Sequence, residues 1–390
     1  MKEINETVRL YDRDAYETEF TAEVLSCEKT SGQIYEVVLD QTLFFPEEGG
    51  QSPDMGAING IQVQDVQIKN NVIYHYLERS LEPGEKVTGK INWQHRFFNM
   101  QQHSGEHLFS GIVYRKFGFK NVGFHLSNQI VTMDFDGVLS EKDVEEVEWE
   151  VNEAISRNLP VEVTFPSKEE LTALEYRSKI EIEGQVRIVT IPGYDVCACC
   201  APHVRYTGEI GMLKVMNVQN YKGGVRISIL CGFRALKAFR EKAAVVSSLM
   251  NTLSTNQEAL VENVDKLKAN NQNLKAQLSS AKQTLLTYKT SEIPEEQEHV
   301  ILFEKDLEAP VMRSVINELV EIHSGICGIF SGEEETGYNY IIGSKNVDCK
   351  TLAVELKEKL NARGGGSNAM IQGSVTAKKV DIEAVLSQGK

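Results

Sequence analysis

Apolar and polar residues alternate from residue 7 to about residue 90, as in the segments AEVLSC (22–27) and IYEVVLD (34–40). Glycine and proline separate these segments, as they do at the ends of strands. Because alternation with a period of two is typical of half-buried strands, we predict that residues 1–90 form a small β-rich module resembling a barrel.

The apolar spacing changes to three and four from residue 93 onward, in WQHRFFNMQQHSGEHLFSGIVYRKFG (93–118). A second segment with this helical spacing is SEKDVEEVEWEVNEAISRN (140–158). Strand-like runs such as VEVTF (161–165) and QVRIVTI (185–191) lie between and after the two predicted helices. This mixture predicts an α+β domain over residues 91–232.

Residues 233–293 contain neither glycine nor proline, and leucine recurs at every seventh position. The repeating leucines are Leu253, Leu260, Leu267 and Leu274. If they are d positions of a heptad, the a positions are apolar apart from Gln257 and Asn271, as in a coiled coil. A helical hairpin that turns at KANNQN (268–273) fits the pattern equally well.

After Pro294 the pattern predicts a small α/β domain over residues 294–390. Its strand-like runs include ICGIFSG (326–332) and YNYIIGS (338–344), and TLAVELKEKLNAR (351–363) has helical spacing. A glycine-rich run, GGGSNAMIQGS (364–374), follows this helix. The chain as a whole therefore belongs to the α+β class.

Composition limits the classes of function. The 390 residues suit about two or three domains, and the formal net charge of −15 argues against a protein that simply coats nucleic acid. A local basic patch is still compatible with that charge. No uncharged apolar segment approaches the length of a membrane span, so we expect a cytoplasmic protein. In that compartment the seven cysteines are expected to be thiols or metal ligands rather than disulfides.

Two pairs of candidate metal ligands share one spacing. His103 and His107 lie four residues apart within a predicted helix, and Cys199 and His203 lie four apart in a turn. One thiolate and three imidazoles suit Zn²⁺. Either histidine could instead be an ordinary hydrogen-bonded residue, and four protein ligands would equally suit a structural zinc. Glu106 does not occupy the metalloprotease position after the first histidine, but it could contact His107 from outside the ligand set.

The ordered motifs resemble a known family. TLFFPEEGGQSPDMG (42–56), MQQHSGEHL (100–108), GFHLS (123–127) and QVRIVTIPGYDVCACCAPHV (185–204) resemble the editing domain of alanyl-tRNA synthetases and, still more, the freestanding alanyl-tRNA editing proteins. The resemblance covers roughly residues 7–232. The long helix and the glycine-rich run resemble the C-terminal domain of the synthetases, as expected for a long-form editing protein.

The resemblance implies a trans-acting, ATP-independent aminoacyl-tRNA deacylase that removes serine, or glycine, from the tRNA for alanine. It also implies a zinc site formed by the two pairs, His103, His107, Cys199 and His203. Where the family has Gly-Gly-Thr between the last two ligands, this chain has Cys200, Ala201 and Pro202. Pro202 removes a backbone N–H just before a ligand. The sequence does not decide whether zinc activates a water or holds the substrate.

Further candidate residues lie in the glycine loop. Gly49 and Gly50 would allow the backbone to approach the terminal adenosine of the tRNA, and Gln51 would act there as donor or acceptor. Without the resemblance, a plain hairpin turn would explain the same residues.

Three other side chains have a functional and an ordinary interpretation. Thr42 could meet a serine hydroxyl or simply favour a strand, and His125 could orient the water or the ester or be an ordinary histidine. Asp195 could accept a hydrogen bond from a metal-bound imidazole or cap the turn. We predict catalytic roles for Gln51, His125 and Thr42.

Binding to tRNA requires local phosphate contacts, and homodimerisation through the long helix and the C-terminal domain is expected from the resemblance. Candidates for the phosphate contacts are Lys116, Lys120 and Arg226, although each could be an ordinary surface residue. The backbone of Gly364, Gly365 and Gly366 could also meet phosphate or a base, or form only a flexible loop.

Two alternative functions stay open. One is a non-catalytic tRNA-binding scaffold with a structural zinc. The other is a thiol sensor, because loss of zinc would release Cys197, Cys199 and Cys200 together. The four-residue spacing of the two ligand pairs predicts that Cys197 and Cys200 are not ligands.

Overall fold

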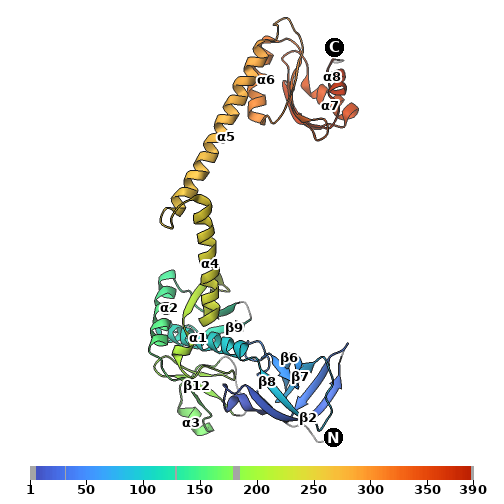
Figure 1. The fold of residues 1–390 in the computed structure, drawn as a ribbon. Coiled ribbons are helices and arrows are strands. Elements are labelled where there is room, and N and C mark those ends of the chain that lie inside the picture. Colours follow the sequence, from blue (N-terminus) through green and yellow to red (C-terminus); the bar gives the residue numbers. More distant parts are fainter. Residues whose placement is uncertain (1–5, 31, 128–129, 179–184, 388–390) are drawn as a thin grey trace. The chain divides into compact units, whose positions relative to one another are not determined.

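The computed structural model describes residues 6–30, 32–127, 130–178 and 185–387 (Figure 1). Contacts divide the chain into two compact units, residues 1–246 and 247–390. The predicted α+β class is confirmed by the sheets and helices of both units. The finer division into four domains stays a prediction. Among the described residues, no helix combines the length and apolar composition that crossing a bilayer requires.

The first unit begins with a closed antiparallel barrel. Its strands, in spatial order, are β2 (Glu19–Lys29), β3 (Tyr35–Leu39), β7 (Val72–Leu77), β6 (Ile61–Lys69), β5 (Gly56–Ile58) and β8 (Lys86–Ile91). Alternate residues of β8 are buried, as the period-two pattern requires. Two short strands, β1 (Val8–Arg9) and β4 (Gln41–Thr42), pair in parallel beside the barrel, and η1 (Leu10–Asp12) follows β1.

The long helix α1 (Trp93–Phe117) follows the barrel. The Asn92 side chain caps its first turn by accepting the His95 N–H, and Gly118 ends it with a left-handed φ of 73°. The helix is buried continuously from Asn99 to Val113. Because the polar residues of this stretch are buried with the apolar ones, α1 can present chemical groups to the interior of the unit.

Two sheets surround α1. The larger has the order β14 (Leu213–Tyr221), β15 (Gly224–Cys231), β10 (Val131–Phe135) and β9 (Asn121–Leu126). The smaller has the order β11 (Glu162–Thr164), β12 (Ile188–Ile191) and β13 (Asp195–Ala198). The remaining helical elements of this region are α2 (Glu141–Ser156), α3 (Lys168–Ala173) and η2 (Thr207–Ile210). One hydrophobic core joins α1, α2 and the larger sheet.

A buried ion pair fastens the barrel to α1. The Arg96 and Asp54 side chains are fully buried, and Arg96 Nε lies 3.0 Å from Asp54 Oδ1. Arg96 also donates to the carbonyl oxygens of Leu43 and Ala15, and Asp54 accepts the Phe45 N–H at 2.7 Å. The loop that ends at Asp54 is therefore held against the helix that carries His103 and His107.

The segment 233–293 forms two helices, α4 (Gly232–Leu253) and α5 (Leu260–Ser291), instead of one continuous helix. Ser254 has a left-handed φ of 49°, and Asn256 Oδ1 accepts the Ala259 N–H at 2.9 Å. These local interactions compete with helical hydrogen bonds and explain the break without glycine or proline. The alternative turn at residues 268–273 is wrong, because α5 runs through it.

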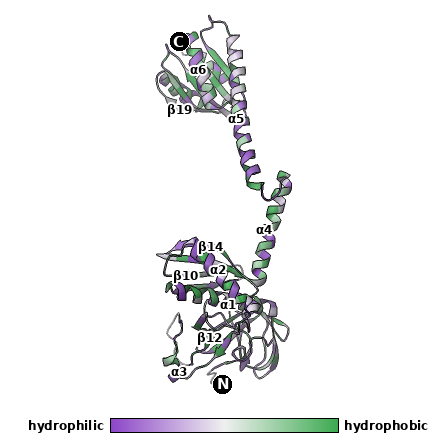
Figure 2. Cartoon of the chain, turned by 90° about the vertical axis from the view of Figure 1, so that its left-hand side faces the viewer, coloured by the Kyte–Doolittle hydropathy of each residue, from purple (hydrophilic) through white to green (hydrophobic). Residues whose placement is uncertain are grey.

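Five apolar positions of the heptad pattern in α5 are exposed within the second unit. Figure 2 colours the residues of this helix by hydropathy. The exposed residues are Val264, Leu267, Leu274, Leu278 and Leu285, with exposed fractions between 45% and 63%. Only the C-terminal end of α5 packs on the domain that follows, through the buried Leu286. These five apolar side chains, the leucine seam of α5, are thus not covered by the described part of their own unit.

The C-terminal domain is a sheet with helices on both faces. Its strand order is β16 (Val300–Glu304), β17 (Cys327–Glu333), β18 (Gly337–Gly343), β20 (Met370–Val375) and β19 (Arg363–Gly366). One core contains α6 (Ala309–Ile322), and the core on the other face contains α7 (Cys349–Leu360) and α8 (Lys379–Ser387).

The glycine run forms the edge strand β19 and is not a flexible loop. A Cβ atom on Gly364 would lie 2.3 Å from the Gln372 carbonyl oxygen, and one on Gly366 would lie 2.3 Å from the Met370 carbonyl oxygen. A Cβ atom on Gly365 would meet no atom within 4 Å. Close approach to β20 therefore requires two of the glycines, and the third faces open space.

Candidate metal centre

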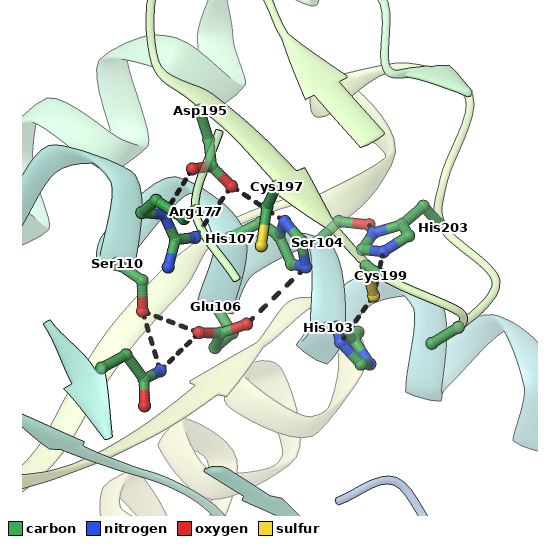
Figure 3. A network of polar contacts seen from close by, with 12 residues as sticks. His103, Ser104, Glu106, His107, Ser110, Arg177, Asp195, Cys197, Cys199 and His203 are labelled. Carbon is green, nitrogen blue, oxygen red and sulfur yellow. Dashed lines mark hydrogen bonds and ion pairs between the residues drawn. The ribbon is translucent and has the colours of Figure 1, made fainter. Parts of the chain in front are cut away.

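The structure brings the two predicted ligand pairs together. His103 and His107 come from adjacent turns of α1, and Cys199 and His203 come from the loop after β13 (Figure 3). One potential ligand atom from each of the four residues lies within 4.8 Å of the others. The three histidines are at most 4% exposed, and Cys199 is half-buried.

The loop that carries Cys199 and His203 is fixed by Arg187. Arg187 Nη1 donates to the carbonyl oxygens of Cys199 at 2.8 Å and Ala201 at 2.9 Å. The Cys199 N–H donates in return to the Arg187 carbonyl oxygen at 3.0 Å. Ala201 is completely buried against the barrel core, so the departure from the family pattern at this position fills a small apolar site.

Each histidine of the cluster holds its Nδ1 atom against an oxygen atom of another side chain. The pairs are His103 with Gln51 Oε1 at 2.8 Å, His107 with Asp195 Oδ2 at 2.9 Å, and His203 with Ser104 Oγ at 3.0 Å. Amide and carboxylate oxygens only accept, so Nδ1 carries the proton in His103 and His107. Their Nε2 lone pairs are then available to a metal.

The Nε2 atoms meet at the Cys199 sulfur. His103 Nε2 lies 3.5 Å from Cys199 Sγ, and His203 Nε2 lies 3.4 Å from it. Burial alone would raise the pKa of the Cys199 thiol, but interactions with the neighbouring imidazoles outweigh burial and lower that pKa well below its ordinary value. A thiolate with three imidazole nitrogens is a donor set for Zn²⁺. The residues therefore fit the metal that the sequence predicts.

The pKa values of His107 and His203 are shifted in opposite directions. Burial lowers the pKa of His107, but its hydrogen bonds with Asp195 and Cys199 outweigh burial and raise that pKa to about 9. Burial and the neighbouring His107 lower the pKa of His203 to about 3. A metal bound here would therefore compete with a proton mainly at His107.

A second group of potential ligands, His107, Asp195 and Cys197, shares His107 with the first group. The guanidinium of Arg177 already faces Asp195 and supplies the positive charge that a cation would bring. Burial raises the pKa of the Cys197 thiol, so Cys197 keeps its proton. This group is thus a support for His107 rather than a second metal site. Of the two interpretations of Asp195, the contact with a ligand imidazole is the one observed.

Glu106 belongs to a buried polar network in the middle of α1. Its Oε1 atom accepts from Ser110 Oγ at 2.7 Å and from Asn121 Nδ2 at 2.6 Å, and its Oε2 atom lies 3.9 Å from His107 Nε2. Glu106 therefore lies beside the His107 imidazole, as the sequence suggests, and is held by Ser110 of α1 and Asn121 of β9.

The glycine loop packs against the end of β9. Gly49 and Gly50 have left-handed φ angles of 62° and 81°, and a Cβ atom on Gly50 would lie 2.4 Å from the Phe124 carbonyl oxygen. The Leu126 N–H donates to the Gly50 carbonyl oxygen at 2.7 Å. These contacts account for both glycines and aim the next residue, Gln51, at the ligand cluster.

Gln51 carries an unused donor. The side chain is 1% exposed, and its Oε1 atom accepts from His103. Its Nε2 atom is buried and finds no hydrogen-bond partner among the residues that the structure describes. A buried donor without a partner is costly, so this N–H₂ group can still donate to a further acceptor beside the four potential metal ligands.

Thr42 and His125 lie outside the cluster. Thr42 is fully buried; its hydroxyl lies 2.9 Å from His75 Nε2 and accepts the Phe44 N–H at 3.1 Å. His125 is exposed on β9, and among the described residues no side-chain hydrogen bond or ring contact joins it to the four potential ligands. The catalytic roles of both residues stay predictions.

The predicted phosphate contacts differ in how far they are already paired. Lys116 Nζ lies 3.1 Å from Glu150, and Arg226 makes two hydrogen bonds with Asp134, at 2.6 and 2.7 Å. Lys120 is exposed on the segment before β9. Pairing reduces the charge that Lys116 and Arg226 can offer to phosphate.

Sequence reasoning missed Ser104 and Arg177. Ser104 follows the first ligand along α1, and its contact with His203 depends on a residue 99 positions away. Arg177 lies 18 residues before Asp195 in a stretch without periodic pattern. Only an argument that every ligand histidine needs a partner for Nδ1 could have prompted a search for them, and it would not have named them.

Comparisons with known proteins identify similar sequences. Residues 5–95 match the family model "tRNA synthetases class II (A)", and residues 186–228 match "Threonyl and Alanyl tRNA synthetase second additional domain". The chain is 30% identical to alanyl-tRNA editing protein Aarsd1 of Rattus norvegicus, with 97% of both chains covered. It is 27% identical to alanyl-tRNA editing protein AlaX-L of Pyrococcus horikoshii, with 96% of both covered. An alanine–tRNA ligase of Ignicoccus hospitalis is 28% identical, over 92% of this chain and 40% of the ligase.

Proposed function

The chain belongs to the family of alanyl-tRNA editing proteins, and we propose that it hydrolyses the ester between a wrongly attached amino acid and the tRNA for alanine. The amino acid removed is serine, or glycine. A synthetic pocket built for alanine cannot strongly reject an analogue that differs by one hydroxyl or one methyl group, so a second hydrolytic site has a physical purpose.

One observation carries the proposal: a buried amide donor without a partner stands beside a zinc-type ligand cluster. Gln51 contacts the ligand His103 through Oε1, and its Nε2 atom lacks a partner in the described part of the chain. A purely structural zinc site would need the acceptor but would gain nothing from the buried donor.

The reaction requires little more than this arrangement. An aminoacyl ester is already activated, so the protein has to orient a water and stabilise the negative charge that develops on the carbonyl oxygen. A bound zinc ion would supply Lewis-acid chemistry, held by His103, His107, Cys199 and His203. The Gln51 Nε2 group would donate to the carbonyl oxygen, and the surrounding burial would exclude other water.

Thr42 and His125 are proposed to assist, Thr42 by meeting the serine hydroxyl and His125 by orienting the water or the ester. The Thr42 hydroxyl keeps one orientation because it contacts His75 and the Phe44 backbone. Such fixed polar groups discriminate substrates better than mobile ones.

Contacts with tRNA are proposed for the exposed Lys120, for Lys116 and Arg226 once their carboxylate partners are displaced, and for the open side of β19 at Gly365. The exposed leucine seam of α5 supports a homodimer, because two such seams would bury each other's apolar side chains.

A second candidate function is a tRNA-binding scaffold with a structural zinc. It is favoured by the complete set of four protein ligands, which closes a tetrahedron without a position for substrate.

The test is a deacylation panel. Purified, zinc-loaded protein is mixed with alanine tRNA charged with serine, glycine or alanine, and a His103→Ala variant serves as the comparison. We expect seryl- or glycyl-tRNA to be hydrolysed faster than alanyl-tRNA, and the variant to leave the ester at its uncatalysed rate. Folded, zinc-loaded wild type that binds tRNA but hydrolyses no ester would contradict the proposal and support the scaffold.

A further inference from the structure

We propose that Arg177 is a positioning residue, which orients the ligand His107 through Asp195 and thereby determines how tightly the site holds its metal. The inference rests on the proposed metal site and adds a residue whose side chain lies outside the ligand set. Arg177 lies in sequence between α3 and β12. Its guanidinium faces the Asp195 carboxylate (Figure 3).

The side-chain geometry forms a relay of three groups. Arg177 Nε donates to Asp195 Oδ1 at 2.7 Å, and Arg177 Nη2 donates to Asp195 Oδ2 at 2.9 Å. Asp195 Oδ2 also accepts from His107 Nδ1 at 2.9 Å. Because one carboxylate oxygen serves both partners, the position of the guanidinium sets the position of the atom that His107 meets.

The backbone of Arg177 makes a second connection to the site. Its N–H donates to the Val196 carbonyl oxygen at 2.8 Å, and its carbonyl oxygen accepts the Ala198 N–H at 2.9 Å. These bonds attach the Arg177 segment to β13, the strand that leads directly into the ligand Cys199. Arg177 is thereby held where its side chain can act on Asp195.

Burial makes the ion pair consequential. The Asp195 side chain is 1% exposed and that of Arg177 is 12% exposed. A buried carboxylate that loses its cationic partner is no longer held in one position. A displaced carboxylate is a poorer acceptor for His107 Nδ1, so the imidazole loses the orientation that brings it close to the other three potential ligands.

The chemistry favours arginine over lysine. Two parallel N–H groups match the two carboxylate oxygens, whereas an ammonium would supply the charge without fixing the plane of the carboxylate. A substitution also has room, because Arg177 and Asp195 line a cavity of about 240 Å³ together with Tyr176 and Tyr194. Water can therefore replace the guanidinium without collapse of the fold.

The experiment measures zinc affinity of the full-length, metal-stripped protein by competition with a chelator, without tRNA. We expect Arg177→Met to bind zinc about 10- to 100-fold more weakly than wild type. The d–d absorption of the cobalt-substituted variant should also shift, because the ligand geometry changes. Arg205→Met is the control: Arg205 lies two residues after His203, but its exposed side chain donates from Nη2 to both carboxylate oxygens of Asp14, at 3.0 and 2.9 Å, and not to Asp195, so the variant should bind zinc as wild type does.

A double substitution tests the route. If Arg177 acts through Asp195, adding Arg177→Met to Asp195→Asn should weaken zinc binding no further than Asp195→Asn alone. If Arg177→Met does not fold, zinc affinity is measured on Arg177→Lys instead, and we expect it to be weaker than that of wild type. Wild-type zinc affinity and an unshifted cobalt spectrum in the folded Arg177 variant would overturn the inference, as would losses that add. A wild-type protein that binds no zinc would overturn the metal site itself.

Discussion

Gln51 presents two atoms with separate tasks, and a glutamate at this position separates them. Oε1 accepts from the ligand His103 at 2.8 Å, whereas Nε2 is a buried donor without a partner among the described residues. In Gln51→Glu, one carboxylate oxygen can still accept from His103. The other replaces a donor with an acceptor of the same shape. The substitution therefore keeps the support of the metal ligand and removes the donor proposed for the substrate.

The expected magnitude follows from the task of the lost donor. Removing one hydrogen-bond donor from an oxyanion site lowers kcat by about 10²- to 10³-fold, which corresponds to about 2.7–4 kcal/mol of transition-state stabilisation. A carboxylate facing the developing negative charge adds repulsion, so we expect a loss of at least about 10²-fold. Zinc affinity should be equal to that of wild type or higher, because a charged acceptor strengthens the hydrogen bond from His103.

The assay is single-turnover hydrolysis of seryl-tRNA for alanine, with zinc content measured on the same samples. Gln62→Glu is the matched control, since it adds the same charge at an exposed position of β6 and should leave the rate unchanged. A wild-type rate in zinc-loaded Gln51→Glu would refute the role of Nε2. Loss of zinc together with activity would mean that Gln51 serves only the metal ligand.

Three further predictions concern stability and assembly. Burial lowers the pKa of His75 to about 4, so the unfolded chain binds a proton below about pH 6.5 that the folded chain does not. The metal-free protein therefore becomes less stable as the pH is lowered. Between pH 8 and pH 5 the free energy of unfolding of the wild type should decrease by about 2 kcal/mol more than that of His75→Gln. Urea unfolding followed by the fluorescence of the two tryptophans, which lie in residues 1–246, measures this difference. An equal loss in both would contradict a neutral His75. Arg96→Met leaves the buried Asp54 carboxylate without its cationic partner and should lower the free energy of unfolding of the same unit by about 3–5 kcal/mol. A decrease below about 1 kcal/mol would contradict a stabilising role of the Arg96–Asp54 ion pair. Substituting Leu267 and Leu274 together by Glu should convert the proposed dimer to a monomer in analytical ultracentrifugation, and a persistent dimer would exclude the α5 seam.

The sequence predicted those parts of the molecule that depend on local periodicity. Alternation along residues 60–77 anticipated strands that belong to the barrel, and the four-residue spacing of His103 and His107 anticipated two rings on one face of α1. The same four-residue spacing of Cys199 and His203 pointed to the loop whose side chains lie beside His103 and His107. Each of these features is set by residues close together in the chain.

The parts that escaped prediction depend on contacts between distant residues or on single dihedral angles. The break between α4 and α5 rests on the left-handed φ of Ser254 and the Asn256 hydrogen bond, in a stretch whose apolar pattern continues without interruption. The roles of Gln51 and Arg177 arise only once the loop, α1 and β13 are in place. No pattern in one segment records a partner that another segment supplies.

Hydrolysis of seryl-tRNA during zinc titration of metal-stripped protein tests the central claim most directly. The account predicts an initial rate near that of buffer, a rise in proportion to added zinc, and a plateau at one zinc per chain. Full activity in the metal-stripped protein, or no hydrolysis above the buffer rate at one bound zinc per chain, would contradict a deacylase built on His103, His107, Cys199 and His203.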